Sequence, residues 1–250
     1  MTPSLFSCIN YKGGTGKTCT VVNMAHAMAL KGHRVLIIDT DSQGSVGFHF
    51  GFPTKKTLYN LLVENAPLSD CVITVRSNID IIASNEHMFP MDLWLHKQPH
   101  RETIFRDRLH SHISSYDVVL FDCSPCFNLM NQNVLLCAPN VLVPVSMEPL
   151  TIPSVRQLIK NIQLLNHHFQ ANVTVAKIIP TFYNSRMKKA KRIHQDLMSQ
   201  YPDLVSSTIR NNVSISEAAG EGKTVYEYSP NGPSVRDFNK LSEEVLNYES

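Results

Sequence analysis

The chain is 250 residues long, with 43% hydrophobic and 18% charged residues, which is enough apolar material for one large core. A formal net charge of +2 excludes a strongly basic or acidic protein, so a nucleic-acid partner would require a local patch of charge. No apolar run approaches the roughly 20 residues of a membrane helix and no signal peptide opens the sequence, so we expect a cytoplasmic protein without membrane insertion.

Strand and helix patterns alternate along the chain. Short apolar runs predict strands buried on both faces, and apolar residues spaced three and four apart predict helices. In chain order we expect a strand at 5–11, a helix at 18–30, a strand at 35–39, a helix at 57–63, a strand at 78–83, a helix at 101–113, strands at 118–122 and 141–147, a helix at 152–169, a strand at 173–182, a helix at 186–199, a strand at 205–209 and a helix at 235–246. Residues 88–101 are expected to form a surface loop or a variable insert.

This alternation predicts a single α/β domain over residues 1–250. Strands separated by helices form a mostly parallel sheet with helices on both faces. Neither an internal repeat nor a linker divides the sequence. In such a sheet, ligands bind beyond the carboxyl ends of the strands, so candidate functional residues are sought there.

A glycine-rich loop separates the first predicted strand from the first predicted helix. Gly13, Gly14 and Gly16 allow successive backbone N–H groups to point at one phosphate. The helix N-terminus adds a partial positive charge, Lys17 can reach the β- and γ-phosphates, and Thr18 can coordinate Mg²⁺. The segment is a variant of the phosphate-loop pattern G-x-x-x-x-G-K-[ST], whose first glycine it lacks.

Three carboxylates stand at the ends of predicted strands. Asp39 and Asp41 end the second strand and Asp122 ends a later one, so all three should converge on the glycine-rich loop. Mg²⁺ keeps several waters and takes few protein ligands, so Asp122 can hold one of those waters while Asp39 supports the metal shell. Asp41 can orient the water that attacks the terminal phosphate. Alone, either Asp39 or Asp41 could equally be an ordinary strand-end cap.

Two further features are less specific. Cys123 and Cys126 form a C-x-x-C pair, but a metal site of this type needs a second pair, so we expect two small core residues in a reduced protein. Residues 186–192 carry five positive charges within two predicted helical turns. Taken alone, such a run is usually a solvated helix face.

Four segments together resemble the ParA/Soj branch of the deviant Walker A ATPases, within the SIMIBI class of P-loop NTPases. Residues 12–18, K-G-G-T-G-K-T, look like the family's K-G-G-x-G-K-T, and residues 39–44, D-T-D-S-Q-G, look like its D-x-D-P-Q-G. Residues 122–125, D-C-S-P, look like its D-C-P-P, and residues 209–218, I-R-N-N-V-S-I-S-E-A, look like its I-P-R-N-V-x-L-S-E-A. The resemblance spans nearly the whole chain, although several of the family's prolines are missing from these segments.

The resemblance implies a Mg²⁺-dependent ATPase that converts ATP to ADP and phosphate and forms a homodimer in its ATP state. It implies that Lys12 reaches the partner's nucleotide, that Lys17 acts within its own chain, and that Asp41 helps to activate water. The nucleotide-contacting residues that it implies are Gly13, Gly14, Thr15, Gly16, Lys17, Thr18, Cys19 and Asn184. The metal ligands and supporting residues are Thr18, Asp39 and Asp122.

The resemblance also implies non-specific binding to DNA, hence association with the nucleoid, and a ParB-like adaptor that stimulates hydrolysis. The DNA-binding candidates are Arg186, Lys188, Lys189, Arg210, Lys223 and Arg236, with Lys191, Arg192 and Lys240 as lesser candidates. The predicted function is therefore the positioning or segregation of a cargo such as a plasmid or chromosome.

Other functions of the same fold remain as alternatives. A MinD-like or other deviant Walker A ATPase could position a non-DNA cargo, such as a protein compartment, a receptor cluster or a membrane site. A membrane switch needs a basic amphipathic C-terminal helix, whereas residues 242–250 carry three glutamates and no lysine or arginine. An iron–sulfur protein needs cysteines placed to share a cluster. The lysine at residue 12 and the S-E-A segment at 216–218 argue against a biosynthetic ligase.

Overall fold

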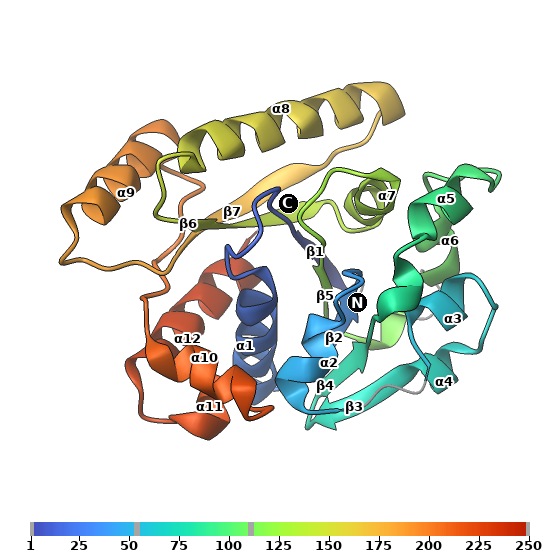
Figure 1. The fold of residues 1–250 in the computed structure, drawn as a ribbon, viewed down its shortest axis with the longest axis horizontal. Coiled ribbons are helices and arrows are strands. Elements are labelled where there is room, and N and C mark those ends of the chain that lie inside the picture. The colour runs from blue at the N-terminus through green and yellow to red at the C-terminus, as the bar shows by residue number, and fades with distance from the viewer. Residues whose placement is uncertain (1–2, 53–55, 110–112, 249–250) are drawn as a thin grey trace.

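The computed structural model describes residues 3–52, 56–109 and 113–248 and shows a central sheet with helices on both faces (Figure 1). The predicted mostly parallel α/β fold is confirmed. The strands are β1 (Ser4–Cys8), β2 (Val35–Asp39), β3 (Val72–Arg76), β4 (Ile79–Ile82), β5 (Val118–Asp122), β6 (Asn140–Ser146) and β7 (Thr174–Thr181).

Within the described residues the sheet has seven strands, in the order β3-β4-β2-β5-β1-β6-β7. Neighbouring strands are parallel except β3 and β4, which are antiparallel. All residues of β2 and β5 are buried, as expected for central strands covered on both faces. The register pairs Asp122 with both Asp39 and Cys8, so the carboxyl ends of β1, β2 and β5 meet at one edge.

Helices cover the two faces of the sheet and enclose two cores. The helices are α1 (Lys17–Leu30), α2 (Ser45–Phe50), α3 (Leu58–Leu62), α4 (Leu68–Cys71), α5 (Met91–His96), α6 (Ile104–Leu109), α7 (Leu129–Cys137), α8 (Thr151–Phe169), α9 (Lys188–Gln200), α10 (Val213–Gly220), α11 (Val225–Tyr228) and α12 (Pro233–Leu246), with 3-10 turns η1 (Glu86–Met88) and η2 (Ile113–Ser115). Leu36 and Ile38 of β2 face the core under α7 and α8, whereas Val35 and Ile37 face the core under α1 and α12. This division follows from the alternation of side chains along a strand.

Local sequence explains where several helices begin. Asn128 accepts a hydrogen bond from the Asn131 backbone N–H at the start of α7, and Asn212 does the same for Ser214 at the start of α10. Pro233 occupies the first turn of α12, where its fixed φ suits a helix and its missing N–H costs nothing.

Three predicted elements were wrong in part. Residues 205–209 do not form a strand, because this segment meets β7 through an isolated bridge, Ile178 to Val205, and scattered backbone hydrogen bonds rather than a continuous ladder. The predicted loop at 88–101 contains α5, whose Met91 and Leu95 are buried in the core. Of the predicted helix at 101–113, only α6 is formed, while residues 110–112 lie outside the described residues.

Several short elements were not predicted, namely β3, α2, α4, α7, α10 and α11. Most of them are too short to display a full period of apolar residues. In the described part of the chain, no helix combines the length and apolar character needed to cross a membrane.

Candidate functional site

The glycine-rich loop connects the end of β1 to the N-terminus of α1. Gly14 and Gly16 have φ angles of 69° and 83°, in the left-handed region that glycine adopts without strain. Gly16 is the N-cap of α1, and no side chain in the described ranges caps this helix. The first N–H groups of α1 are therefore available to an anion, with the helix dipole adding positive potential.

Side chains anchor the loop to the neighbouring strands. The Thr181 hydroxyl at the end of β7 donates to the Thr15 carbonyl at 2.8 Å. The Asn10 amide donates to the Pro144 carbonyl of β6 at 2.7 Å, and its oxygen accepts from the Lys12 backbone N–H at 3.1 Å. These bonds fix the loop shape from several directions, which preorganises its backbone N–H groups for a ligand.

The two lysines of the loop differ in environment. Lys17 is buried, and its Nζ donates to the Lys12 carbonyl at 3.5 Å, so the ammonium group folds back over the loop. The Lys12 side chain is exposed. The hydrogen bond and charge of Lys189 are the main causes that lower the pKa of Glu148, and the charge of Lys12 adds a smaller contribution. The glycine-rich loop therefore carries one buried and one exposed lysine.

Asp39 and Asp122 form a buried acidic pair beside this loop. They are 0% and 1% exposed and lie side by side in the register of β2 and β5. Asp39 accepts from the backbone N–H groups of Asp41 and Val46, both at 3.0 Å. Burial and the charge of Asp122 raise the pKa of Asp39 well above its ordinary value, despite these bonds.

Of these two carboxylates, that of Asp122 makes fewer hydrogen bonds. Neither of its oxygens has a hydrogen-bond partner within the described residues. Burial raises the pKa of Asp122 to about 7, while nearby Thr18 and Lys17 oppose the shift. Oxygen ligands of this kind, beside a threonine hydroxyl, fit a hard divalent cation.

A cation at this site would need ligands in addition to those that the protein provides. The described residues contain no cluster of three or more His, Cys, Asp or Glu side chains able to hold a metal ion. Two carboxylates and a hydroxyl suit an ion such as Mg²⁺, which takes few protein ligands and keeps waters or substrate phosphates in its shell.

Asp41 lies one residue beyond Thr40, on the loop that leads into α2. Its Oδ1 accepts from the Gln43 backbone N–H at 3.0 Å, which fixes the turn. A cavity of about 390 Å³ adjoins this loop and is lined in part by Asp41, Gln43, Phe89 and Ser124. Phe89 is 86% exposed and comes from the stretch predicted as an irregular loop, so sequence reasoning missed its place beside the site.

Two further residues expected to contact the nucleotide, Cys19 and Asn184, are less closely tied to the loop. Cys19 lies in the first turn of α1 and receives a bond from the Asn23 amide on its carbonyl. Asn184 uses its side-chain oxygen to accept from the Arg186 backbone N–H at 3.0 Å. Phe182, which the sequence did not single out, packs its ring against Gly16, and its φ of 51° is unusual for a bulky residue.

The DNA-binding candidates do not form one cluster, since Lys223 follows Gly222, which lies against Gly51 and Arg76, and they also differ in pairing. The bridge between Tyr183 and Arg210 brings the segment before α9 close to the segment before α10. Three candidates form ion pairs, Lys189 with Glu148 at 2.7 Å, Arg210 with Asp237 at 2.7 Å and Lys223 with Glu221 at 2.8 Å. Arg186 precedes α9, Lys188 begins it, and Arg236 lies on α12.

Of the two C-x-x-C residues, Cys123 lies in the core as expected, whereas Cys126 is half-buried and lines the cavity beside Asp41. Cys123 is buried, and burial raises the pKa of its thiol above its ordinary value. Cys126 lies 3.0 Å from the Ser124 hydroxyl, and the Asn131 amide donates to its carbonyl at 2.7 Å. The two thiols are not joined in a disulfide.

A glycine loop at a helix N-terminus, a buried lysine and acidic residues ending the adjacent strands define a P-loop nucleotide-binding protein. The family described as an AAA domain matches residues 4–175. Two relatives align along almost the whole chain. The chromosome partitioning protein ParA of Caulobacter vibrioides is 30% identical, with 96% of this chain and 92% of that protein covered. The cell division protein PomZ of Myxococcus xanthus is 33% identical over 95% of this chain and 76% of its own length. The chain belongs to the ParA/Soj family of P-loop ATPases.

Solved structures confirm the fold. An ATP complex of Cyanothece McdA superimposes with a TM-score of 0.87 at 18% identity, covering 99% of this chain and 98% of that one. A cobyrinic acid a,c-diamide synthase from Mycobacterium smegmatis, with a bound ATP analogue and magnesium, gives a TM-score of 0.83 at 22% identity, covering 98% and 95%. At these identities the comparison concerns the fold alone.

Proposed function

We propose that this protein is a Mg²⁺-dependent ATPase that positions or segregates a cargo, dimerises with ATP bound and binds DNA without sequence preference. Its turnover alone is slow and is stimulated by a ParB-like adaptor, because a switch must occupy two states with different partner affinities. It works in the cytoplasm on the surface of the nucleoid. Family membership supports the positioning role, and the geometry of the site supports the chemistry.

The observation that carries the proposal is the buried Asp122 carboxylate beside Lys17 and the free N-terminus of α1. A carboxylate without partners in a dry site is costly unless a cation comes to it. The helix N-terminus, by contrast, favours the binding of an anion. A nucleotide triphosphate with its Mg²⁺ supplies both charges at once, and related structures have been solved with such ligands.

The chain's own residues then take separate tasks. Lys17 and the backbone of residues 13–18 bind the phosphates, while Thr18, Asp39 and Asp122 would hold the metal and its waters. When bound, Mg²⁺ neutralises phosphate charge and orients the terminal phosphate. Asp41 orients the attacking water, and the exposed Lys12 extends toward the nucleotide of the partner subunit.

The DNA surface is proposed to lie at the β7 edge, where Arg186 and Lys188 approach Arg210. A dimer doubles this surface. If the dimer neutralises about six phosphates, the slope of log K against log salt is about −5.

The test measures DNA binding by fluorescence anisotropy, with ATP, with ADP and without nucleotide, across a salt series. We expect DNA binding only in the presence of ATP, a steep dependence of affinity on salt and equal affinity for unrelated duplexes. Nucleotide affinity is measured separately with a fluorescent ATP analogue, with and without Mg²⁺. A protein that binds no ATP contradicts the ATPase proposal, whereas ATP binding with a flat salt response contradicts only the DNA-binding part.

One relative favours a second cargo. PomZ is named as a cell division protein and is among the more similar relatives, which favours a protein machine rather than a plasmid or chromosome as the cargo. The adaptor recovered with the ATP-bound protein distinguishes the two proposed cargoes, because a centromere-binding adaptor indicates partition of DNA.

A further inference from the structure

The segment formed by α10 and α11 (residues 213–228) contacts two helices, α2 through α10 and α1 through α11, that both follow loops of the phosphate site (Figure 1). Helix α1 starts directly at Gly16 of the glycine-rich loop. Helix α2 follows the Asp41 turn, and its Val46 N–H is bonded to the carboxylate of Asp39. The α10–α11 segment is therefore placed to respond to the position of α2 relative to α1.

Helix α2 has the form of a short rigid unit between two hinges. It has six residues and is flanked by Gly44 and Gly51, with φ angles of 63° and 70°. A Cβ placed on Gly44 would stand 2.8 Å from the Ser84 carbonyl oxygen, so the chain passes close to the residues that follow β4 at that hinge. Hinges of this kind absorb backbone rotation when a bound ligand moves a loop.

The second hinge of α2 packs directly on the α10–α11 segment. Gly51 and Gly222 meet backbone to backbone, and a Cβ on Gly222 would lie 2.8 Å from the Gly51 Cα. Gly222 also has a left-handed φ of 65°. The contact leaves no room for a side chain, so displacement of the end of α2 is passed to residue 222.

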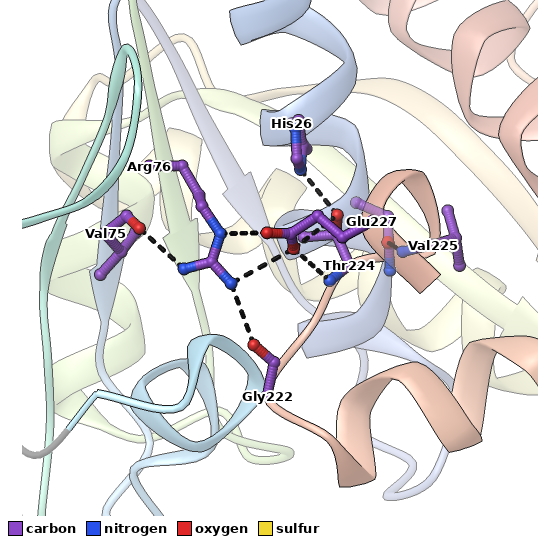
Figure 2. A network of polar contacts seen from close by, with 8 residues as sticks. His26, Val75, Arg76, Gly222, Thr224, Val225 and Glu227 are labelled. Carbon is purple, nitrogen blue, oxygen red and sulfur yellow. Dashed lines mark hydrogen bonds and ion pairs between the residues drawn. The ribbon is translucent and has the colours of Figure 1, made fainter. Parts of the chain in front are cut away.

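Arg76, at the end of β3, ties these two parts together (Figure 2). Its guanidinium group lies 5.5 Å and 6.0 Å from the ring centroids of Phe50 and Phe52. The same group donates to the Gly222 carbonyl at 3.0 Å and forms an ion pair with Glu227. A planar group with several donors can make all of these contacts at once, whereas an ammonium group cannot.

The other side of the α10–α11 segment is attached to α1. The Asn23 side-chain oxygen accepts from the Val225 backbone N–H at 2.9 Å, and His26 Nδ1 lies 2.6 Å from the Thr224 hydroxyl. Glu227 completes the capping box of α11 by accepting from the Thr224 backbone N–H at 2.8 Å. Glu227 is thus both a helix cap and the acidic partner of Arg76.

We propose that Arg76 is a positioning residue that couples α2 to the α10–α11 segment, so that nucleotide binding at the loop is transmitted to the surface beginning at Arg210. This inference rests on the proposed function, since it requires nucleotide-dependent movement of α2. The transmitted change reaches the DNA-binding candidates because Asn212, which caps α10, follows Arg210 by two residues.

The test is hydrogen exchange with mass spectrometry on the full chain, without nucleotide and with ATPγS and Mg²⁺. In the parent protein we expect nucleotide to slow exchange in residues 39–52 and in residues 213–228. In Arg76→Lys and Glu227→Gln, the response of 39–52 persists, while that of 213–228 falls about fivefold or more, as expected for the loss of a typical coupling energy. Glutamine retains the capping box, so Glu227→Gln separates the ion pair from the cap.

Matched controls are Arg101→Lys and Glu102→Gln, which alter another ion pair, of 2.9 Å, in the turn before α6. These variants should retain both responses. The inference is wrong if 213–228 responds equally in the parent and in the Arg76 and Glu227 variants, or if it stays unchanged in a parent whose 39–52 region responds. Loss of both responses in Arg76→Lys also overturns it, because Arg76 would then only support the fold. A parent protein that binds no ATPγS contradicts the proposed function instead, and a fluorescent-nucleotide titration shows this independently.

Discussion

Asp122 carries a buried charge whose removal can be measured directly. Replacing it by asparagine keeps the size of the side chain and removes the charge. Burial raises the pKa of this carboxyl to about 7, and Asp41 adds to the shift while Thr18 and Lys17 oppose it. We expect Asp122→Asn to stabilise the ligand-free protein and to abolish its stabilisation by ATP with Mg²⁺.

The magnitude follows from the difference between the pKa of Asp122 in the unfolded and folded chain. With an ordinary pKa of 3.8 and a folded pKa of about 7, the ionised carboxyl costs the folded state about 4 kcal/mol. The cost is absent below the unfolded value and grows as the pH rises toward the folded value, because the folded state holds the proton more tightly. The buried amide of the variant lacks partners and costs about 1–3 kcal/mol. The net gain at pH 8 is therefore about 2 kcal/mol, or about 4–8 °C in Tm for a domain of this size.

The assay is thermal unfolding of parent and variant between pH 5 and pH 8 without nucleotide. In their difference the contributions of His26, His49 and His194 cancel, because these residues are present in both proteins, whereas the relief of Asp39 from the charge of Asp122 adds to the gain of the variant. Burial lowers the pKa of these histidines, so they destabilise both proteins equally as the pH falls below about 6.5. A variant that is less stable than the parent at pH 8, or a difference that does not shrink toward pH 5, refutes the reasoning.

Three further substitutions test other parts of the molecule. Asp41→Ala should reduce hydrolysis about 100-fold or more while ATP-dependent DNA binding persists, because only water orientation is lost; retained turnover contradicts the role of Asp41. Lys12→Gln should leave nucleotide affinity intact and abolish the ATP-dependent dimer, measured by light scattering; a normal dimer contradicts the role in trans. Gly222→Ala should lower the free energy of unfolding by about 1–3 kcal/mol through left-handed strain and the clash with Gly51, and an unchanged urea midpoint argues against that contact.

The sequence was most informative where a pattern is both local and complete. The strands ending at Asp39 and Asp122 are short apolar runs, because a parallel strand covered on both faces must be apolar along its length. The glycine loop between β1 and α1 is equally local, so its residues and spacing suffice to predict a phosphate site.

Features that depend on distant partners could not be predicted in this way. The role of Arg76 depends on its ion pair with Glu227, which lies 151 positions away in the sequence and is brought next to it only by the fold. The segment at 205–209 has strand-like residues, but whether it forms a continuous ladder depends on β7, to which it is joined by an isolated bridge and scattered backbone hydrogen bonds. The pairing of Lys189 with Glu148 is hidden for the same reason, because the two residues are 41 positions apart.

The ion pair between Arg210 and Asp237 affects how the positive residues can act on DNA. Asp237 accepts from the backbone N–H of Arg210 at 3.1 Å as well as from its guanidinium group, and it is only 9% exposed, so the pair is part of the fold. A phosphate would compete with a carboxylate that is already bound in a two-pronged geometry. Arg186 has no ion pair in the described ranges and its side chain is exposed, so it can meet a phosphate without giving up a partner. The slope of log K against log salt depends on how many phosphates are neutralised, not on how many positive residues are present. Positive residues that already form ion pairs therefore contribute less to this slope than unpaired ones. We therefore expect the proposed DNA surface to be centred on the start of α9, with Arg210 contributing mainly by holding the start of α10 beside it.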